Sequence, residues 1–307
     1  ASRQTFTVPD GDFNHDHLFY ENIQAGKNRD NAAISCSFGV VYSRKALKAI
    51  GGFSEWNLVE DLHTSYIANS KGYRSVYVTQ PYTLGHAPTD LSQVYKQRGT
   101  WALDTLRIFF WQNPLLQKGL TWRQKLHYFE MCYAYLVSAY FITGIYLINF
   151  YSLFTDEVIL SGGWWYVVFR LPAMIASLWL FGRMSRGQLT WRIWAGLFPV
   201  YAIAGVKALF YRKKKPQYIV TSKVDHGKPE VRLVIPQLLM SFIGVFGLIY
   251  HIIVFGINLM FIFNFFWIGV MLYWLWPVIS IGLKFKDIRV WTRKYSLQKT
   301  KRLSATS

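Results

Sequence analysis

The chain has 307 residues, of which 52% are hydrophobic and 18% aromatic, and its formal net charge is +18. Apolar residues gathered in long runs at this proportion indicate an integral membrane protein. The positive charge does not indicate a nucleic-acid-binding protein, because the lysines and arginines cluster beside the apolar runs. Anionic lipid head groups and the basic cytosolic loops of membrane proteins explain such clusters more simply.

Residues 1–110 have the pattern of a soluble α/β layer, because helical and strand-like segments alternate. Apolar spacing and branched residues predict both kinds of element. The strands are expected over 33–42 and 74–78, and the helices over 13–25, 44–50 and 62–71. Gly51 and Gly72 follow two of these helices as stop signals. The stretch is too short for a complete nucleotide-binding sheet, so the sequence predicts only part of one.

No set of metal ligands is readable in this chain. Two aspartates in segment 9–17 have the spacing of a DxD metal motif, but a glycine lies between them, and a surface turn is the simpler interpretation. The histidines beside them lack the spacing of a closed zinc site. These residues are Asp10, Asp12, His15, Asp16 and His17. The only cysteines, Cys36 and Cys132, have positions that favour neither a disulfide nor a metal site.

Two adjacent carboxylates, Glu60 and Asp61, lie directly before the predicted helix over 62–71. A helix N-terminus favours the charged form of a carboxylate. A charged carboxylate within reach of a hydroxyl group can act as a general base in a transfer reaction. Acids are also common at helix starts for structural reasons alone. On these residues by themselves, both interpretations stay open.

Residues 92–118 predict one or two amphipathic helices, with Thr89 or Asp90 as the N-cap. Next to a membrane span, such a basic and aromatic-rich stretch indicates a helix at the lipid interface. Trp101, near its start, has two interpretations. Its ring could stack on a sugar, or it could belong to the aromatic belt of the interface.

Five apolar runs follow, and their charged neighbours sort them into spans and an interfacial helix. The run over 190–211 lies between basic loops and contains Pro199 and Lys207, so we expect it to lie on the cytosolic face of the membrane. The other four are predicted to cross the membrane, which places both chain ends in the cytosol. These spans are expected over 128–154, 162–182, 233–255 and 258–283.

Segment 212–230 contains three consecutive lysines and then Pro216, which favours an extended chain. A solvated basic loop that binds lipid head groups explains this composition by itself. The tail over 285–307 is basic and has little apolar content, so we predict that it lies in the cytosol.

Three short segments stand in one order along the chain: Val59-Glu60-Asp61, Gln97-Arg98-Gly99-Thr100-Trp101 and Tyr218-Ile219-Val220-Thr221-Ser222-Lys223. Together they resemble the TED motif, the QxxRW motif and the FxVTxK gating loop of the processive family-2 glycosyltransferases, the cellulose synthase superfamily. The sequence departs from these motifs at Val59, Thr100 and Tyr218, where the family has Thr, Arg and Phe. The resemblance extends over essentially the whole chain and implies the C-terminal half of a longer synthase.

The resemblance implies a role for each matching position. Asp61, with Glu60 beside it, would be the catalytic base on the acceptor hydroxyl. Gln97 and Trp101 would bind the acceptor. Cys36 matches a cysteine of the family's acceptor-binding strand, although a buried small residue explains it equally well. The donor nucleotide would be contacted by four residues of the matching segments: Arg98, Tyr218, Thr221 and Lys223.

The fold expected from this resemblance is the C-terminal part of a GT-A type α/β domain over 1–110, followed by a helical transmembrane bundle with interfacial helices over 111–284. The implied reaction polymerises a hexose from a UDP-sugar, with UDP-glucose and a β-glucan such as cellulose as the expected pair, and passes the polymer across the membrane. Two alternatives stay open: a non-processive transferase that acts on a lipid acceptor, and a non-catalytic transport or structural subunit.

The resemblance also implies a location and partners. The protein would lie in the plasma (inner) membrane, with its catalytic domain in the cytosol, where the sugar nucleotide is found. Mg²⁺ or Mn²⁺ would be held by residues outside this chain. The implied partners are the UDP-sugar, the growing polysaccharide, membrane lipids, and a missing N-terminal half or accessory subunits.

Overall fold

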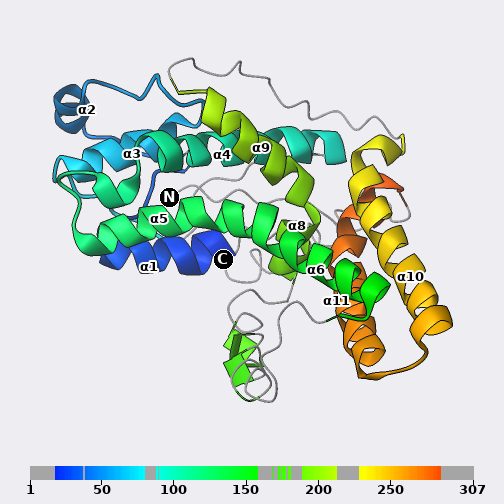
Figure 1. The fold of residues 1–307 in the computed structure, drawn as a ribbon. Helices are drawn as coiled ribbons and strands as arrows, with labels where there is room; N and C mark the ends of the chain where they lie inside the picture. The colour runs from blue at the N-terminus through cyan, green and yellow to red at the C-terminus, as the bar shows by residue number, and fades with distance from the viewer. Residues whose placement is uncertain are drawn as a thin grey trace, which may run out of the picture. The chain divides into compact units, whose positions relative to one another are not determined.

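The computed structural model of the chain describes residues 18–36, 39–79, 88, 90–157, 168, 172–173, 175–177, 179–180, 189–212 and 228–284. They fall into two compact units. Unit 1 contains the described residues of Asn14–Ala139 and Pro199–His226, and unit 2 contains those of Tyr140–Phe198 and Gly227–Ser307. All regular secondary structure in the described residues is helical (Figure 1).

Unit 1 is built from helices, several of which have ends fixed by specific caps. They are the π-helical turn η1 (Leu18–Ile23), α1 (Gln24–Arg29), α2 (Arg44–Ile50), α3 (Glu60–Ser70), α4 (Leu91–Trp111), the 3₁₀ turn η2 (Pro114–Leu116), α5 (Trp122–Leu136) and nearly all of α9 (Phe198–Phe210). Gly51 ends α2 with a φ of 92°, a conformation that favours glycine. Asp90 caps α4 by accepting a hydrogen bond from the Gln93 amide at 3.0 Å. Both signals are readable in the sequence.

The predicted strands over 33–42 and 74–78 contain no strand among their described residues. The side chains of Asn28, in α1, and of Asn31, two residues after its end, bind backbone amides that a sheet would use. The Ser75 amide donates to Asn31 Oδ1 at 2.8 Å, and the Tyr77 amide donates to Asn28 Oδ1 at 2.8 Å. A strand needs a ladder of backbone hydrogen bonds with a neighbour, so the described residues leave the α/β class unconfirmed.

The core of unit 1 packs α3, α4 and α5 together. Its buried residues are Ile34, Leu62, Tyr66, Ile108, Leu120, Tyr128 and Cys132. Tyr66 of α3 and Tyr128 of α5 meet edge to face, with ring centroids 5.1 Å apart, a favourable aromatic geometry. The Tyr66 hydroxyl donates to the Gln112 carbonyl at 2.9 Å, just after α4. The two helices that carry the first two motifs are therefore fixed to one another.

Unit 2 is a bundle of longer apolar helices. Its helices are α6 (Ile142–Thr155), α8 (Leu189–Gly196), the 3₁₀ turn η4 (Val231–Val234), α10 (Ile235–Phe255) and α11 (Leu259–Gly282), and the π-helical turn η3 (Val137–Phe141) has its last two residues in this unit. Small residues let these helices approach closely. A methyl group at Gly244 of α10 would lie 2.9 Å from Met271 Cε of α11, and one at Gly196 of α8 would lie 2.5 Å from Val278 Cγ2.

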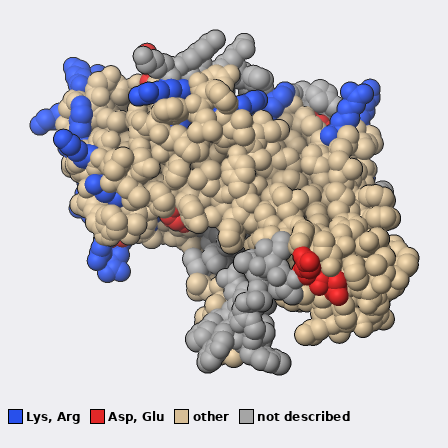
Figure 2. Space-filling view, viewed as in Figure 1, with Lys and Arg blue, Asp and Glu red and all other residues tan. Residues whose placement is uncertain are grey.

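Three helical stretches are long and apolar enough to cross a membrane: Trp122–Thr155, Val231–Phe255 and Leu259–Gly282. By length and composition they overlap three of the predicted spans, 128–154, 233–255 and 258–283, whereas most of 162–182 lies outside the described residues. The visible face of α10 and α11 shows almost no charged side chains (Figure 2). Large apolar side chains are exposed on these helices, among them Phe242, Ile253, Leu259 and Phe265. Such a surface suits lipid.

The single helix predicted over 190–211 is two helices, α8 and α9, separated by a turn at Leu197. Pro199 is the reason, because proline removes a hydrogen bond and clashes with the preceding turn inside a helix. Proline is tolerated at the second residue of α9, because a backbone N–H at that position would have no acceptor inside the helix.

Candidate active site

The predicted acids lie at the start of α3. Glu60 and Asp61 are its first two residues; Glu60 is exposed and Asp61 is half-buried. Asp61 Oδ1 accepts a hydrogen bond from the Leu62 amide at 2.6 Å. The carboxylate therefore lies against the amides that a helix leaves without partners at its start. This position favours the charged form, which a general base needs.

Ser35 ties the segment that carries Cys36 to this helix start. Its amide donates to Ser65 Oγ at 2.9 Å, and its hydroxyl donates to the Asp61 carbonyl at 3.1 Å. The Tyr42 hydroxyl in turn donates to Ser35 Oγ. Burial raises the pKa of Tyr42, and the negative charge of Asp61 raises it further, so this hydroxyl stays protonated. The sequence does not single out Tyr42, whose only signal is a hydroxyl within an apolar run.

Gln24 of α1 holds the other side of the same segment. Its amide nitrogen donates to the Ile34 carbonyl at 2.7 Å and to Cys36 Sγ at 3.3 Å. Its amide oxygen accepts from the Ile34 amide at 3.2 Å. Gln24 is fully buried, whereas Cys36 is half-buried. Cys36 is thus held next to the contact between Ser35 and Asp61.

The second motif lies on α4. The Arg98 guanidinium carbon lies 4.5 Å from the centroid of the Trp101 ring, and Arg98 is 6% exposed. Gln97 Oε1 is buried and accepts no hydrogen bond from the described residues. A methyl group at Gly99 would lie 3.2 Å from Val200 Cγ1 of α9. The glycine therefore lets α9 pack closely on the motif.

A buried ion pair of α4 contacts the turn before the acids. We call residues 54–59 the acid turn. Asp104 Oδ2 accepts from the Val59 amide at 2.6 Å, and Asp104 Oδ1 lies 3.1 Å from Arg107 Nη1. Both side chains are fully buried. Burial raises the pKa of Asp104, whereas the bonds from Val59 and Arg107 lower it. In the sequence, the only signal of this pair is opposite charges three residues apart on a helix.

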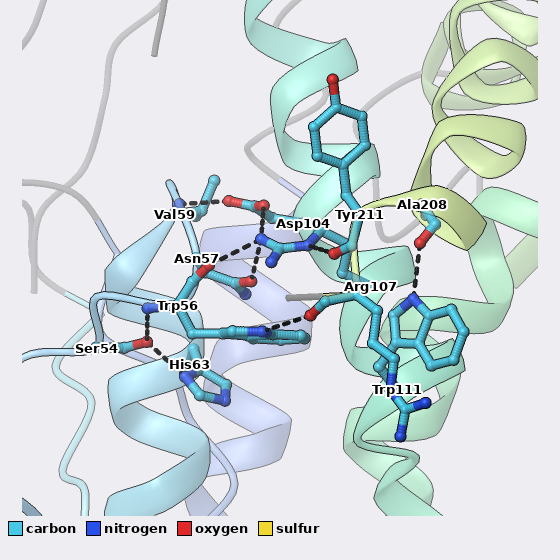
Figure 3. A network of polar contacts seen from close by, with 11 residues as sticks. Ser54, Trp56, Asn57, Val59, His63, Asp104, Arg107, Trp111, Ala208 and Tyr211 are labelled. Atoms are coloured by element: carbon cyan, nitrogen blue, oxygen red, sulfur yellow. Dashed lines mark hydrogen bonds and ion pairs between the residues drawn. The ribbon is translucent and has the colours of Figure 1, made fainter. Parts of the chain in front are cut away.

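The end of α9 is capped by side chains from the acid turn and from α4 (Figure 3). Each donates a hydrogen bond to a backbone carbonyl: Arg107 Nε to Tyr211 at 2.7 Å, Trp56 Nε1 to Arg212 at 3.0 Å, and Trp111 Nε1 to Ala208 at 2.8 Å. The Ala208 carbonyl lies in the last turn of α9, where carbonyls have no partner inside the helix, and the Tyr211 and Arg212 carbonyls follow that turn. These donors therefore satisfy groups that would otherwise need water.

His63 is a further buried group that the sequence does not point to. Its Nε2 donates to Gln112 Oε1 at 2.6 Å, since an amide oxygen only accepts, and its Nδ1 pairs with the Ser54 hydroxyl. It is 5% exposed. Burial lowers the pKa of His63, and the positive charge of Arg107 lowers it further. A neutral His63 therefore fastens the acid turn to the end of α4.

The remaining predicted residues lie outside the described part of the chain. These are Tyr218, Thr221 and Lys223 of the third motif, and Asp10, Asp12, His15, Asp16 and His17. Within the described ranges, no three His, Cys, Asp or Glu side chains gather closely enough to hold a metal ion.

Several cellulose synthases are similar to the chain. It is 29% identical over 248 residues to the UDP-forming cellulose synthase catalytic subunit of Pseudomonas fluorescens, which covers 76% of this chain and 33% of the relative. It is 26% identical over 306 residues to the cellulose synthase 1 catalytic subunit of Komagataeibacter xylinus, and the match covers 92% of this chain and 39% of the relative. The UDP-forming cellulose synthase catalytic subunit of Xanthomonas axonopodis is 36% identical over 115 residues, which cover 38% of this chain and 16% of the relative. The chain spans between a third and two fifths of the length of the first two relatives.

A family model described as glycosyl transferase family group 2 matches residues 4–182, more than half of the chain. This match includes the acid turn, α3 and α4, and so both of the motifs that the structure describes. The relatives agree with it. The chain therefore belongs to glycosyl transferase family group 2.

Proposed function

We propose that this chain supplies the acceptor side and the membrane part of a processive, inverting glycosyltransferase. It polymerises a hexose from a UDP-sugar, with UDP-glucose as the donor and a cellulose-like β-glucan as the product. Family membership and the similarity to cellulose synthase catalytic subunits support this reaction class. One observation carries the proposal. Asp104, on the helix with Gln97 and Trp101, holds the Val59 amide directly before Glu60 and Asp61.

Asp61 is the proposed general base. It takes the proton from the acceptor hydroxyl while that oxygen forms its bond to the anomeric carbon and the bond to the nucleotide diphosphate breaks. Attack on the face opposite the leaving group inverts the anomeric centre. The place of Asp61 in the first turn of α3 favours its charge. Glu60 adds a second negative charge at the same helix end.

The acceptor chain is proposed to lie against Gln97, Trp101 and Cys36. The buried Gln97 Oε1 would accept a hydrogen bond from a sugar hydroxyl, because a buried polar atom usually has a partner. Trp101 would present to the sugar the ring face that Arg98 does not cover. Cys36 would lie at the same end of the site, since Ser35 ties its segment to Asp61.

The donor nucleotide is proposed to contact Arg98, Tyr218, Thr221 and Lys223, which supply positive charge and hydroxyl groups for a diphosphate. The divalent cation expected with such a donor, Mg²⁺ or Mn²⁺, would neutralise the leaving diphosphate. The described residues offer no ligand set for it. We therefore assign its binding to residues outside them and derive no step through it.

The membrane part is proposed to carry the polymer outwards, with residues 1–110 in the cytosol and the predicted spans forming the bundle. We also propose that 33–42 and 74–78 join a GT-A sheet whose other strands come from residues outside those described, because an isolated strand has no ladder. An N-terminal half or accessory subunits would be the partners that complete it.

The test uses membranes that contain the complete protein, supplied with radiolabelled UDP-glucose and Mg²⁺. Long polymer that stays at the origin of a chromatogram, and that Asp61→Asn abolishes, is the expected result. A product of one sugar on a lipid would contradict processivity. No transfer from UDP-glucose or from any other UDP-sugar would contradict the proposed enzyme.

A further inference from the structure

We propose that Arg107 is a positioning residue, which holds the turn before Asp61 and the end of α9 in a fixed relation. This inference rests on the proposed function, in which Asp61 is the base and the chain beyond Arg212 leads to the donor contacts. Arg107 acts through the backbone of the acid turn and of α9, and its role is separate from that of the motif residues.

Arg107 connects three parts of unit 1 that are far apart in the sequence. Its Nη1 donates to the Trp56 carbonyl at 2.8 Å and to Asn57 Oδ1 at 3.2 Å, both in the acid turn. Its Nε donates to the Tyr211 carbonyl at 2.7 Å, at the end of α9. The third part is α4 itself, through Asp104. Because the guanidinium group is planar and rigid, these bonds fix directions as well as distances.

Trp56 repeats the connection with an independent donor. The Arg107 guanidinium carbon lies 4.3 Å from the centroid of the Trp56 ring, and Trp56 Nε1 donates to the carbonyl of Arg212. The stacked pair therefore holds two successive carbonyls, those of Tyr211 and Arg212 (Figure 3). The Val59 amide on Asp104 extends this order to the residue before Glu60.

Stability alone does not explain this arrangement. A buried ion pair contributes little net stability, because both charges lose their hydration. Two further buried donors, Arg107 Nη2 and Asn57 Nδ2, have no hydrogen-bond partner among the described residues, and such groups destabilise a fold. A well-packed apolar pair of similar volume would fold about as well. The hydrogen bonds of Arg107, Asp104 and Asn57 therefore serve to fix the positions of the segments that they join.

Geometry at this place matters for a transfer reaction. The acid turn sets the position of the base, and the end of α9 sets where the chain leaves towards the third motif. A displacement of about 1 Å between reacting groups can lower a rate about a hundredfold. Arg107 donates hydrogen bonds to both places directly, to the Trp56 carbonyl and to the Tyr211 carbonyl, and Trp56 reaches the neighbouring Arg212 carbonyl.

The test uses the complete protein in membrane vesicles with UDP-glucose and Mg²⁺, and it compares three variants. Arg107→Lys keeps a positive charge beside Asp104 but cannot form the planar set of bonds. Trp56→Phe keeps a ring but loses the indole donor of the acid turn. Trp111→Phe is the matched control, because its indole also donates to a carbonyl at the end of α9 but comes from α4.

Two products are measured for each variant: polymer, and free glucose from hydrolysis of the donor by water. We expect Arg107→Lys to lower kcat for polymer by about ten- to a hundredfold, with a smaller change in KM, and to raise the fraction of donor that is hydrolysed. Trp56→Phe should raise the hydrolysed fraction of the donor by a smaller amount, and Trp111→Phe should leave that fraction at the wild-type level. Polymer and hydrolysis falling in equal proportion in Arg107→Lys would mean structural support only and would overturn the proposal.

Hydrogen exchange followed by mass spectrometry separates a failure of this inference from a failure of the proposed function. In Arg107→Lys, amides of 54–62 and of 205–212 should exchange faster together, whereas in Trp111→Phe only those of 205–212 should. Unchanged exchange over 54–62 in Arg107→Lys would overturn the coupling, whatever the activity. If the amides of 54–62 and 205–212 exchange faster together but the protein transfers no sugar, the proposed function is overturned. The link between Arg107 and catalysis is then overturned as well.

Discussion

Unit 1 and unit 2 bury different kinds of polar group. Among the described residues, the buried Asp, Lys and Arg side chains all belong to unit 1: Lys27, Asp90, Arg98, Asp104 and Arg107. The buried polar residues of unit 2 in the same set are amides, hydroxyls and one histidine: Asn149, Ser152, Gln237, His251, Asn264 and Ser280. The two units thus fix their interiors in different ways.

The difference follows from the surroundings that each unit is built for. The helices of unit 2 expose apolar side chains, and inside a membrane a buried charge is expensive while a neutral hydrogen bond is tolerated. Asn264 Nδ2 donates to Ser152 Oγ at 3.0 Å, and Gln237 Nε2 donates to the Gly196 carbonyl at 2.7 Å. Unit 1 buries charge at the acid turn, where a backbone segment without helical hydrogen bonds must keep one conformation.

The largest expected effect comes from breaking the ion pair of unit 1. Asp104→Ala leaves Arg107 as a buried charge without its partner, and we expect the free energy of unfolding to fall by about 3–5 kcal/mol. Ser152→Ala removes one neutral hydrogen bond in unit 2 and should lower it by only about 1 kcal/mol. Chemical unfolding of the purified protein in detergent measures both. Equal losses would remove the contrast between the units.

Close packing is the corresponding weak point of unit 2. In Gly196→Ala the new methyl group would lie 2.5 Å from Val278 Cγ2, and a branched valine has little freedom to rotate away. We expect a loss of about 1–3 kcal/mol. Gly269→Ala is the control, because nothing lies within 4 Å of its added methyl group, and it should show no loss. Thermal unfolding in detergent separates the two, and identical midpoints would argue against the close contact.

The smallest effect is a pH dependence that belongs to unit 1. Because burial lowers the pKa of His63 in the folded protein, the unfolded chain binds more protons between the two pKa values. The contribution of neutral His63 to the free energy of unfolding is then fully present above the pKa of histidine in the unfolded chain, about 6.5, and it is lost as the pH falls below that value. His63→Gln should flatten this slope in unfolding midpoints measured from pH 7.5 down to pH 5. An unchanged slope would mean that another group titrates.

Local signals made several elements predictable. Gly51 follows a helix in the sequence and ends α2 in the structure, and Asp90 is one of two predicted caps of α4 and is the cap observed. Both depend only on neighbours within a few residues. Long apolar runs likewise predict the helices that are long enough to cross a membrane, because length and hydropathy are local properties too.

Contacts between distant segments were not predictable in the same way. The predicted strands over 33–42 and 74–78 have side chains typical of strands. In the folded chain, however, Asn28 of α1 and Asn31 just after α1 bind backbone amides of the second segment, which the sequence does not show. Arg107 looks like one more charge on an amphipathic helix until the Trp56 and Tyr211 carbonyls are seen beside it. The roles of the motif residues come from the family resemblance and stay predictions.

The most direct measurement compares Asp61→Asn with Glu55→Gln, an exposed acid in the acid turn before α3, in polymer synthesis from UDP-glucose by the complete protein. Asparagine keeps the shape of Asp61 and an oxygen for the Leu62 amide, but it cannot take a proton. We expect Asp61→Asn to lose at least about a hundredfold in rate, with wild-type accumulation and unfolding midpoint, and Glu55→Gln to match the wild type. Polymer made by Asp61→Asn at the rate of Glu55→Gln would contradict the assignment of Asp61 as the base.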